Sequence, residues 1–218
     1  ICTGTHLSHE FGYTKKEIYK DKLKVDYNVN LKLGKRDNED SICKALGRAF
    51  IGFSKAYQKL KPDIIVVLGD RYELLAAAYS ATIYKIPICH IHGGESTIGA
   101  FDEATRHSIT KMSHLHFVAN QKYKKRVIQL GENPRYVHNV GGMGVDVINT
   151  LKLLDKNELE KTLKIKFNKK TNFLIVFHPV TLEDKTSETQ FKNLLNALLK
   201  FKNANFFFSQ SNADPGAK

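Results

Sequence analysis

The sequence predicts a doubly wound α/β protein, with parallel sheets covered by helices. Three observations predict this fold class. Apolar runs alternate with amphipathic stretches along the chain, as expected when each strand is followed by a crossover helix. Runs such as IIVVL and FLIVF are continuously apolar, which is typical of parallel strands covered on both faces. Polar residues gather directly after these runs, where open α/β sheets bind their ligands.

Strand-like and helix-like segments alternate in a regular order. Strands are expected at 63–70, 86–94, 115–120, 136–142, 173–179 and 204–212. Helices are expected at 39–60, 71–85, 101–113, 120–130, 145–164 and 187–202. The turn GGMG at Gly141–Gly144 closes the first run of strands, so we place a domain boundary there. The first domain is expected at 1–142, and a second, partial domain with two strands at 143–218.

Composition indicates a soluble globular protein, because 42% of the 218 residues are hydrophobic and 26% are charged. No apolar run approaches the ~18 residues that a membrane span needs, and the N-terminus lacks the pattern of a signal peptide. We therefore expect no membrane partner and a cytoplasmic location. The three cysteines form no CxxC pair, which indicates reduced structural thiols. Cys89 lies inside an apolar strand and is expected in the core.

The net charge of +12 raises the possibility of a nucleic-acid partner. The densest basic cluster is only KYKKR at 122–126, and no aromatic interleaving or nucleic-acid motif accompanies it. A solvated basic face that contributes to binding an anionic ligand is the favoured interpretation, and no nucleic-acid partner is expected. The chain begins at Ile1 and ends directly after an apolar run, so we expect it to be a fragment.

Five of the nine histidines lie between His90 and His116, together with several carboxylates. Zinc is the first hypothesis, since His90 and His92, or His114 and His116, are spaced like chelating pairs on a strand. A zinc site would need a third ligand at a convincing spacing, and none is found. We therefore expect no metal, with structural roles for His114 and His116.

The residues that follow the strands are candidates for a site. Asp70 can instead be the N-cap of the following helix, which is an equally plausible interpretation. In the helix expected at 101–113, Asp102 and Arg106 lie four residues apart, as do Glu103 and His107, which is the spacing of ordinary ion pairs. Because this helix starts just after the GGE loop, its positive end and Asp102 are expected to face the crevice, which favours a functional role for Asp102 and Arg106. The residues after the strands are Asp70, Arg71, Glu95, His178, Ser211 and Asn212.

Five segments together resemble the UDP-N-acetylglucosamine 2-epimerase family, and within it the hydrolysing branch that serves sialic acid synthesis. The resemblance extends from Thr3 to Lys218, and the ordered set is highly specific. It implies the glycosyltransferase-B architecture, in which two Rossmann-like domains enclose the active site; the first would be nearly complete here and the second partial. The segments are GDRYELLAAA, HIHGGE, DEATRHSITKMSHLHF, KKRVIQLGE and FHPVTLE.

The chain departs from the family pattern in three places. The opening strand with its TGxRAxY-like turn has no counterpart before Ile1, and the Ser-rich loop that holds much of the UDP has none up to Lys218. Many relatives carry a carboxylate where this chain has His92. The histidine form resembles bacterial members of the sialic acid pathway, so the role of this position shifts while the reaction remains compatible.

The resemblance implies conversion of UDP-N-acetylglucosamine and water to N-acetylmannosamine and UDP. A base removes the C2 proton as UDP leaves C1, and water then adds to 2-acetamidoglucal with inversion at C2. A UDP-sugar is therefore the implied partner, and neither a metal nor a nicotinamide cofactor is required. A homodimer or homotetramer is the implied assembly. The catalytic candidates are Asp70, Asp102 and His178, then Glu95 and His92, and the substrate-binding candidates are Arg71, Arg106, His107, Ser211 and Asn212.

Three alternatives remain open. Close relatives act on UDP-N,N'-diacetylbacillosamine in legionaminic acid synthesis, and the motifs do not distinguish the two substrates. A glycosyltransferase of the same architecture would need an acceptor pocket and usually lacks the DEATRH and HPVT pair together. A non-enzymatic protein that binds a nucleotide sugar is supported only by the ends of the chain.

Overall fold

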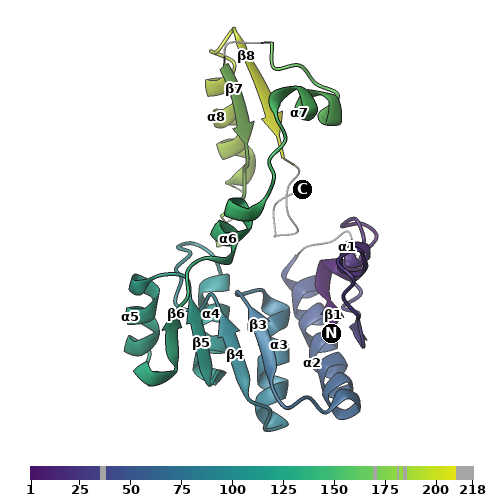
Figure 1. Ribbon diagram of the computed structural model, residues 1–218, viewed down its shortest axis with the longest axis vertical. Helices are drawn as coiled ribbons and strands as arrows, with labels where there is room; N and C mark the ends of the chain where they lie inside the picture. The colour runs from purple at the N-terminus through teal and green to yellow at the C-terminus, as the bar shows by residue number, and fades with distance from the viewer. Residues whose placement is uncertain (35–37, 169–170, 181, 184–185, 210–218) are drawn as a thin grey trace. The chain divides into compact units, whose positions relative to one another are not determined.

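The computed structural model describes residues 1–34, 38–168, 171–180, 182–183 and 186–209, which form two compact units, Ile1–Met143 and Gly144–Lys218 (Figure 1). The boundary expected from the sequence lies between residues 142 and 143. Ser211 and Asn212 lie outside the described residues. None of the helices described here combines the length and the apolar composition needed to cross a bilayer.

The first unit contains the main sheet. Strands β3 to β6 are all parallel and lie side by side in the order β3-β4-β5-β6, while β1 and β2 form a separate parallel pair. The elements in chain order are β1 (Cys2–Thr3), the 3-10 helix η1 (Gly4–Leu7), α1 (Lys15–Lys20), β2 (Asn28–Val29), α2 (Glu39–Leu60), β3 (Ile65–Leu68), α3 (Tyr72–Ile83), β4 (Ile88–Ile91), α4 (Asp102–Met112), β5 (Leu115–Val118), α5 (Gln121–Gln129), η2 (Pro134–Tyr136) and β6 (Val137–Asn139).

The second unit is smaller. Its two strands pair in parallel with Thr171 opposite Ala204. The long helix expected at 145–164 is wrong, because the chain forms two helices separated by residues 151–155. Asp155 starts the second of them with a capping box, in which its side chain and that of Glu158 each accept a backbone N–H. The elements are α6 (Met143–Thr150), which begins at the boundary, α7 (Lys156–Leu163), β7 (Thr171–Ile175), α8 (Ser187–Leu198) and β8 (Ala204–Phe208).

Helix α3 packs against both α2 and α4, and α5 packs on β5 and β6. Small residues allow α3 to approach its neighbouring helices closely, since its buried face includes Ala76, Ala77, Ala78 and Ala81. The hydroxyl of Tyr57 on α2 donates to the carbonyl of Ala77 at 3.1 Å, which satisfies a buried polar group between the helices. Cys89 is buried in β4, as expected for a core thiol.

The strands β3 and β7 are not covered on both faces, contrary to the interpretation of their continuous apolar runs. Ile65 and Val67 pack into the core with α2 and α3, whereas Val66 and Leu68 are 62% and 52% exposed. In β7, Leu174 is 77% exposed. Successive side chains of a strand point to opposite faces, and within the described residues the packed helices bury only one face of β3. An apolar run by itself therefore did not show how many faces are buried.

Candidate active site

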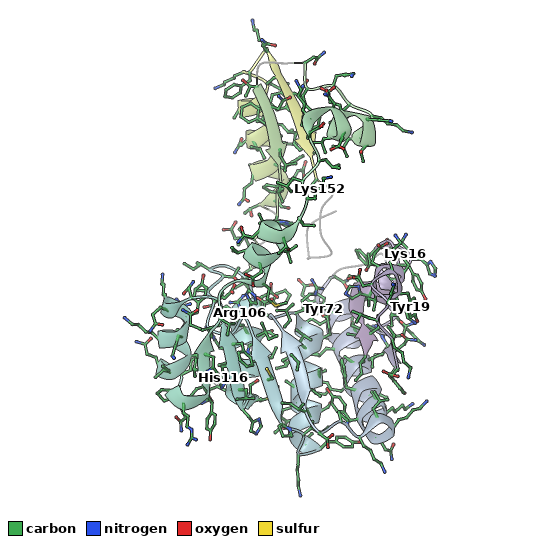
Figure 2. All side chains as sticks on the ribbon, in the orientation of Figure 1. Lys16, Tyr19, Tyr72, Arg106, His116 and Lys152 are labelled. Carbon is green, nitrogen blue, oxygen red and sulfur yellow. The ribbon has the colours of Figure 1, made fainter. Side chains whose placement is uncertain are left out.

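The candidate site lies where β3, β4 and β5 end. Because these strands are parallel and adjacent, their carboxyl ends meet at one edge of the sheet. Figure 2 shows Arg106 and Tyr72 at this edge, whereas His116 lies deeper in the sheet. The segments that follow these strands, together with the start of α4, supply the site residues of the first unit.

Asp70 follows β3 through a tight turn in which Gly69 has a φ of 81°. The N-cap of α3 is Arg71, and among the described residues no side-chain capping hydrogen bond is found there, so the interpretation of Asp70 as the helix cap is wrong. The Asp70 carboxylate instead forms an ion pair with Arg106 of α4. His90 supports the turn from β4, since its Nε2 donates to the carbonyl of Gly69 at 2.9 Å.

Arg106 connects the ends of β3 and β4. Its side chain is only 3% exposed, so its charge must be matched within the protein. Nη2 contacts Asp70 and donates to the hydroxyl of Thr97 at 2.8 Å. Nη1 donates to the backbone carbonyl of Glu95 at 3.1 Å and to the carboxylate of Glu103 at 2.9 Å. One buried guanidinium thus fixes Asp70 relative to the loop at 92–97.

Glu103 anchors the same loop from the first turn of α4. Its carboxylate accepts hydrogen bonds from the Thr97 backbone N–H at 2.5 Å, the Ser96 hydroxyl at 3.0 Å and His107 Nε2 at 3.1 Å. Partial burial acts to raise the pKa of Glu103, but these hydrogen bonds outweigh burial and lower the pKa to about 2. Glu103 is therefore an anion at neutral pH, suited to holding the loop and poorly suited to donating a proton.

His92 and Glu95 form a hydrogen-bonded pair at the end of β4. Nδ1 of His92 lies 2.6 Å from Oε1 of Glu95, and the two side chains are 24% and 32% exposed. His92 has a φ of 64°, a left-handed conformation that is costly for a residue with a Cβ. Its backbone N–H donates to the carbonyl of Phe117, which helps to hold this conformation. Strained backbone of this kind is concentrated at functional sites.

Two glycines let the loop pack closely against its surroundings. Gly94 has a φ of 77°, and a Cβ built on it would lie 2.6 Å from the Tyr123 carbonyl oxygen of α5. Arg126 of α5 donates to the carbonyl of Gly94 at 2.5 Å. A Cβ on Gly93 would lie 3.0 Å from Nδ1 of His90. Packing of the loop on α5 therefore requires Gly94, and a side chain at position 93 would crowd His90 of β4.

The remaining candidates occupy different places. Arg71 begins the α3 segment and donates from Nε to Glu73 at 3.3 Å. Asp102 is the first residue of α4. His107 lies one turn further along α4, where its Nε2 contacts Glu103. His178 follows β7 in the second unit. The structure thus brings together Asp70, Arg106, Glu95, His92 and His107 within one unit.

The buried histidines of the sheet have structural roles. His90 is fully buried and lies opposite His116 in the strand register. Burial lowers the pKa of His90 to about 4, and the nearby His116 and Arg106 add to this effect. Burial also lowers the pKa of His116, against the opposing effect of Glu132, which lies 3.3 Å from its Nε2. In the part of the chain that the structure describes, no three His, Cys, Asp or Glu side chains gather as metal ligands would.

Sequence reasoning missed the structural importance of Glu103, Ser96 and Thr97. The spacing of Glu103, three residues before Arg106 and four before His107, indicates contacts on one face of a helix. The same spacing occurs in ordinary surface ion pairs, so it did not mark Glu103 as part of a site. Ser96 and Thr97 lie in a loop without periodicity, so no local pattern marked them. Their contacts to Glu103 depend on the path of the loop after β4.

Comparison with known proteins identifies the family. A family model described as UDP-N-acetylglucosamine 2-epimerase matches residues 1–218. The chain is 46% identical over 214 residues to the Campylobacter jejuni protein named GDP/UDP-N,N'-diacetylbacillosamine 2-epimerase (hydrolyzing), covering 98% of this chain and 55% of that protein. It is 40% identical over 220 residues to the Escherichia coli polysialic acid biosynthesis protein P7, covering 99% of this chain and 54% of that protein.

A solved structure supports the fold. The crystal structure of UDP-GlcNAc 2-epimerase from Neisseria meningitidis bound to UDP-GlcNAc matches with a TM-score of 0.76 at 22% identity, covering 95% of this chain and 56% of that one. The chain thus spans about half the length of these relatives. The likeness shows that this chain shares its parallel α/β fold with about half of that structure. On the match of the family model along the whole sequence, this chain belongs to the UDP-N-acetylglucosamine 2-epimerase family.

Proposed function

We propose that the protein is a hydrolysing 2-epimerase that converts a UDP-2-acetamido sugar and water to UDP and the free 2-epimeric sugar. The observation that carries the proposal is the cluster at the ends of β3 and β4, in which Arg106 links Asp70 to the loop bearing His92 and Glu95. It contains two carboxylates and an imidazole at the ligand-binding edge of a sheet. The family membership of the chain gives this chemistry its reaction class.

The reaction needs a base on one face of the sugar and an acid on the other. The base takes the C2 proton while the C1–O bond breaks and UDP leaves; water then supplies oxygen to C1, and the acid supplies a proton to C2 from the opposite face. In this proposal the His92–Glu95 pair is one of the two groups. Glu95 accepts the Nδ1 proton of neutral His92, which leaves the Nε2 lone pair available for proton transfer.

Asp70, Asp102 and His178 are the proposed candidates for the second proton-transfer group. Arg106 fixes the position of Asp70 relative to the His92 loop. We propose a positioning role for Arg106, because its buried terminal nitrogens already have protein acceptors. Arg71, whose side chain is 40% exposed, is the better candidate for a contact with the departing diphosphate.

UDP-N-acetylglucosamine is the substrate expected from the sequence. A second candidate, UDP-N,N'-diacetylbacillosamine, is favoured by the 46% identity to the Campylobacter jejuni protein named for that sugar. The two substrates differ at C4 and C6, away from the bonds that break and form. Incubating the full-length protein with an equimolar mixture and comparing kcat/KM for each would assign the substrate.

Isotope labelling tests the reaction itself. In D₂O, the free sugar released by the full-length protein should carry deuterium at C2, because elimination gives the original C2 hydrogen to a group that exchanges with solvent. UDP should accumulate in equal amount. Mass spectrometry and proton NMR of early product would show both results. A 2-epimeric product that keeps its original C2 hydrogen would rule out elimination, and transfer of an unlabelled sugar to an acceptor would indicate a glycosyltransferase.

Substitution of Asp102 tests its proposed chemical role. Asp102→Asn should lower turnover at least about a hundredfold, in line with general acid–base contributions of ~10² to 10⁴. The circular dichroism spectrum should remain native, since Asn keeps the size of the side chain. Wild-type turnover in this variant would remove Asp102 from the mechanism.

A further inference from the structure

Glu73 is a buried carboxylate beside the candidate site that the proposed reaction does not use. It lies in the first turn of α3, and its side chain is only 8% exposed. Oε1 accepts from Nε of Arg71 at 3.3 Å, whereas Oε2 is buried without a hydrogen-bond partner among the described residues. An unsatisfied buried polar atom costs on the order of 1–3 kcal/mol. Stability alone therefore does not explain a carboxylate here.

The η1 turn closes over Glu73 from the end of β1. Gly4 in this turn is buried and has a φ of 64°, and a Cβ built on it would lie 2.6 Å from Oε1 of Glu73. A side chain at position 4 would displace the carboxylate. Because Gly4 has no Cβ, the Glu73 carboxylate has room to lie between the turn after β1 and Arg71, which follows β3.

Arg71 is held on a second side by an aromatic ring. Its guanidinium carbon lies 5.6 Å from the ring centroid of Tyr72, a cation–π distance. Tyr72 lies at the edge of the sheet that Arg106 also occupies (Figure 2). Arg71 therefore presents a partly exposed, fixed cation at this edge, while the carboxylate that fixes it is buried.

We propose that Glu73 is a positioning residue that orients Arg71 to bind the diphosphate of the UDP-sugar. The proposal rests on the proposed function and assigns Glu73 no contact with substrate. Arginine binds phosphate through a planar fork of donors, so its orientation determines how many hydrogen bonds it forms. Glu73 and Gly4 supply that orientation before the ligand arrives.

A double-mutant cycle tests the coupling. UDP affinity of the full-length protein is measured by calorimetry for wild type, Glu73→Gln, Arg71→Ala and the double variant. Glu73→Gln should weaken UDP binding about tenfold, the scale of one charge-assisted hydrogen bond. In the Arg71→Ala background the same substitution should change the affinity less than about twofold, because the group that Glu73 acts through is gone. Equal losses in both backgrounds would overturn the proposal.

A second pair of variants controls for simple loss of packing. Gly4→Ala should weaken UDP binding, since its Cβ displaces Glu73, whereas Gly12→Ala should not, because position 12 has a φ of 85° and nothing within 4 Å. A lower melting temperature of Glu73→Gln with unchanged UDP affinity would assign Glu73 a structural role only. UDP binding is measured directly, so a protein that binds UDP without releasing an epimerised sugar would remove the proposed reaction and still allow the coupling to be measured.

Discussion

At the scale of the residue, the candidate site combines side chains of two kinds. Arg106 and Glu103 are bound by several protein partners and hold neighbouring segments in place. His92 and Glu95 bind each other and remain partly exposed. A group whose hydrogen-bonding atoms are already bound by several protein partners is suited to holding segments in place, whereas a pair bound to each other is better suited to meeting a substrate. On these contacts we propose Arg106 and Glu103 as positioning groups and His92 and Glu95 as reacting groups.

The His92–Glu95 pair gives the first prediction. Glu95→Gln should lower turnover about 10- to 100-fold, because an amide orients the imidazole less effectively and does not stabilise its protonated form. Asp40→Asn is the control, as Asp40 pairs with Lys44 on the exposed surface of α2. Turnover equal to wild type would show that Glu95 does not act through His92.

At the scale of the element, the site residues lie at the ends of short strands and in the compact loop at 92–97. β4 spans only Ile88–Ile91, and the loop that follows is held by α4 through Arg106 and by α5 through Arg126. Because the loop is hydrogen-bonded to two helices, its conformation depends on how the first unit packs. Its close approach to α5 depends on Gly94.

Substitution of Gly94 gives the second prediction. Gly94→Ala should destabilise the protein by about 2–4 kcal/mol, since left-handed strain of ~1–2 kcal/mol adds to a steric clash with the Tyr123 carbonyl. Gly12→Ala is the matched control, since its similar φ and open surroundings leave only the strain. Urea unfolding of both variants measures the difference. Equal losses would show that the contact with α5 adds nothing beyond backbone strain.

At the scale of the whole molecule, the main sheet contains two adjacent buried histidines. His90 and His116 face each other across β4 and β5, and burial lowers the pKa of both. Below the ordinary pKa of 6.5, the unfolded chain takes up protons that the folded protein does not. Stability is therefore complete above this pH and falls as the pH drops toward the folded pKa of His90, about 4.

The pH dependence of stability gives the third prediction. The free energy of unfolding should fall by about 2 kcal/mol between pH 7.5 and 5 from His90 alone, at about 1.36 kcal/mol per pH unit below its ordinary pKa. His116 should add to the loss. Urea unfolding at both pH values measures this loss of stability. The control variant His138→Gln, which removes an exposed histidine, should lose the same free energy of unfolding between the two pH values as wild type. Constant stability over this range would mean that His90 is protonated in the folded state.

From the sequence alone we predict the α/β class, the span of α2 and the alternation of strands and helices from α2 to β6, because hydrophobic periodicity reports local structure. It also marked Asp70, Glu95 and Arg106 as candidates, since polar residues after strands and at helix starts are visible locally. Two-residue strands such as β1 and β2 were missed, because so few residues show no alternation. The apolar run of β3 likewise did not show that only one of its faces is buried.

How the candidates pair depends on the tertiary structure. Asp70 meets Arg106 across 36 positions of sequence because β3 lies next to β4 and α4 returns to the same edge. Glu73 meets Gly4 because the turn after β1 packs on the start of α3. Such contacts depend on strand order and on the paths of loops, which one-dimensional patterns do not encode. The chemistry of each residue was thus visible in the sequence, and its partner was set by the fold.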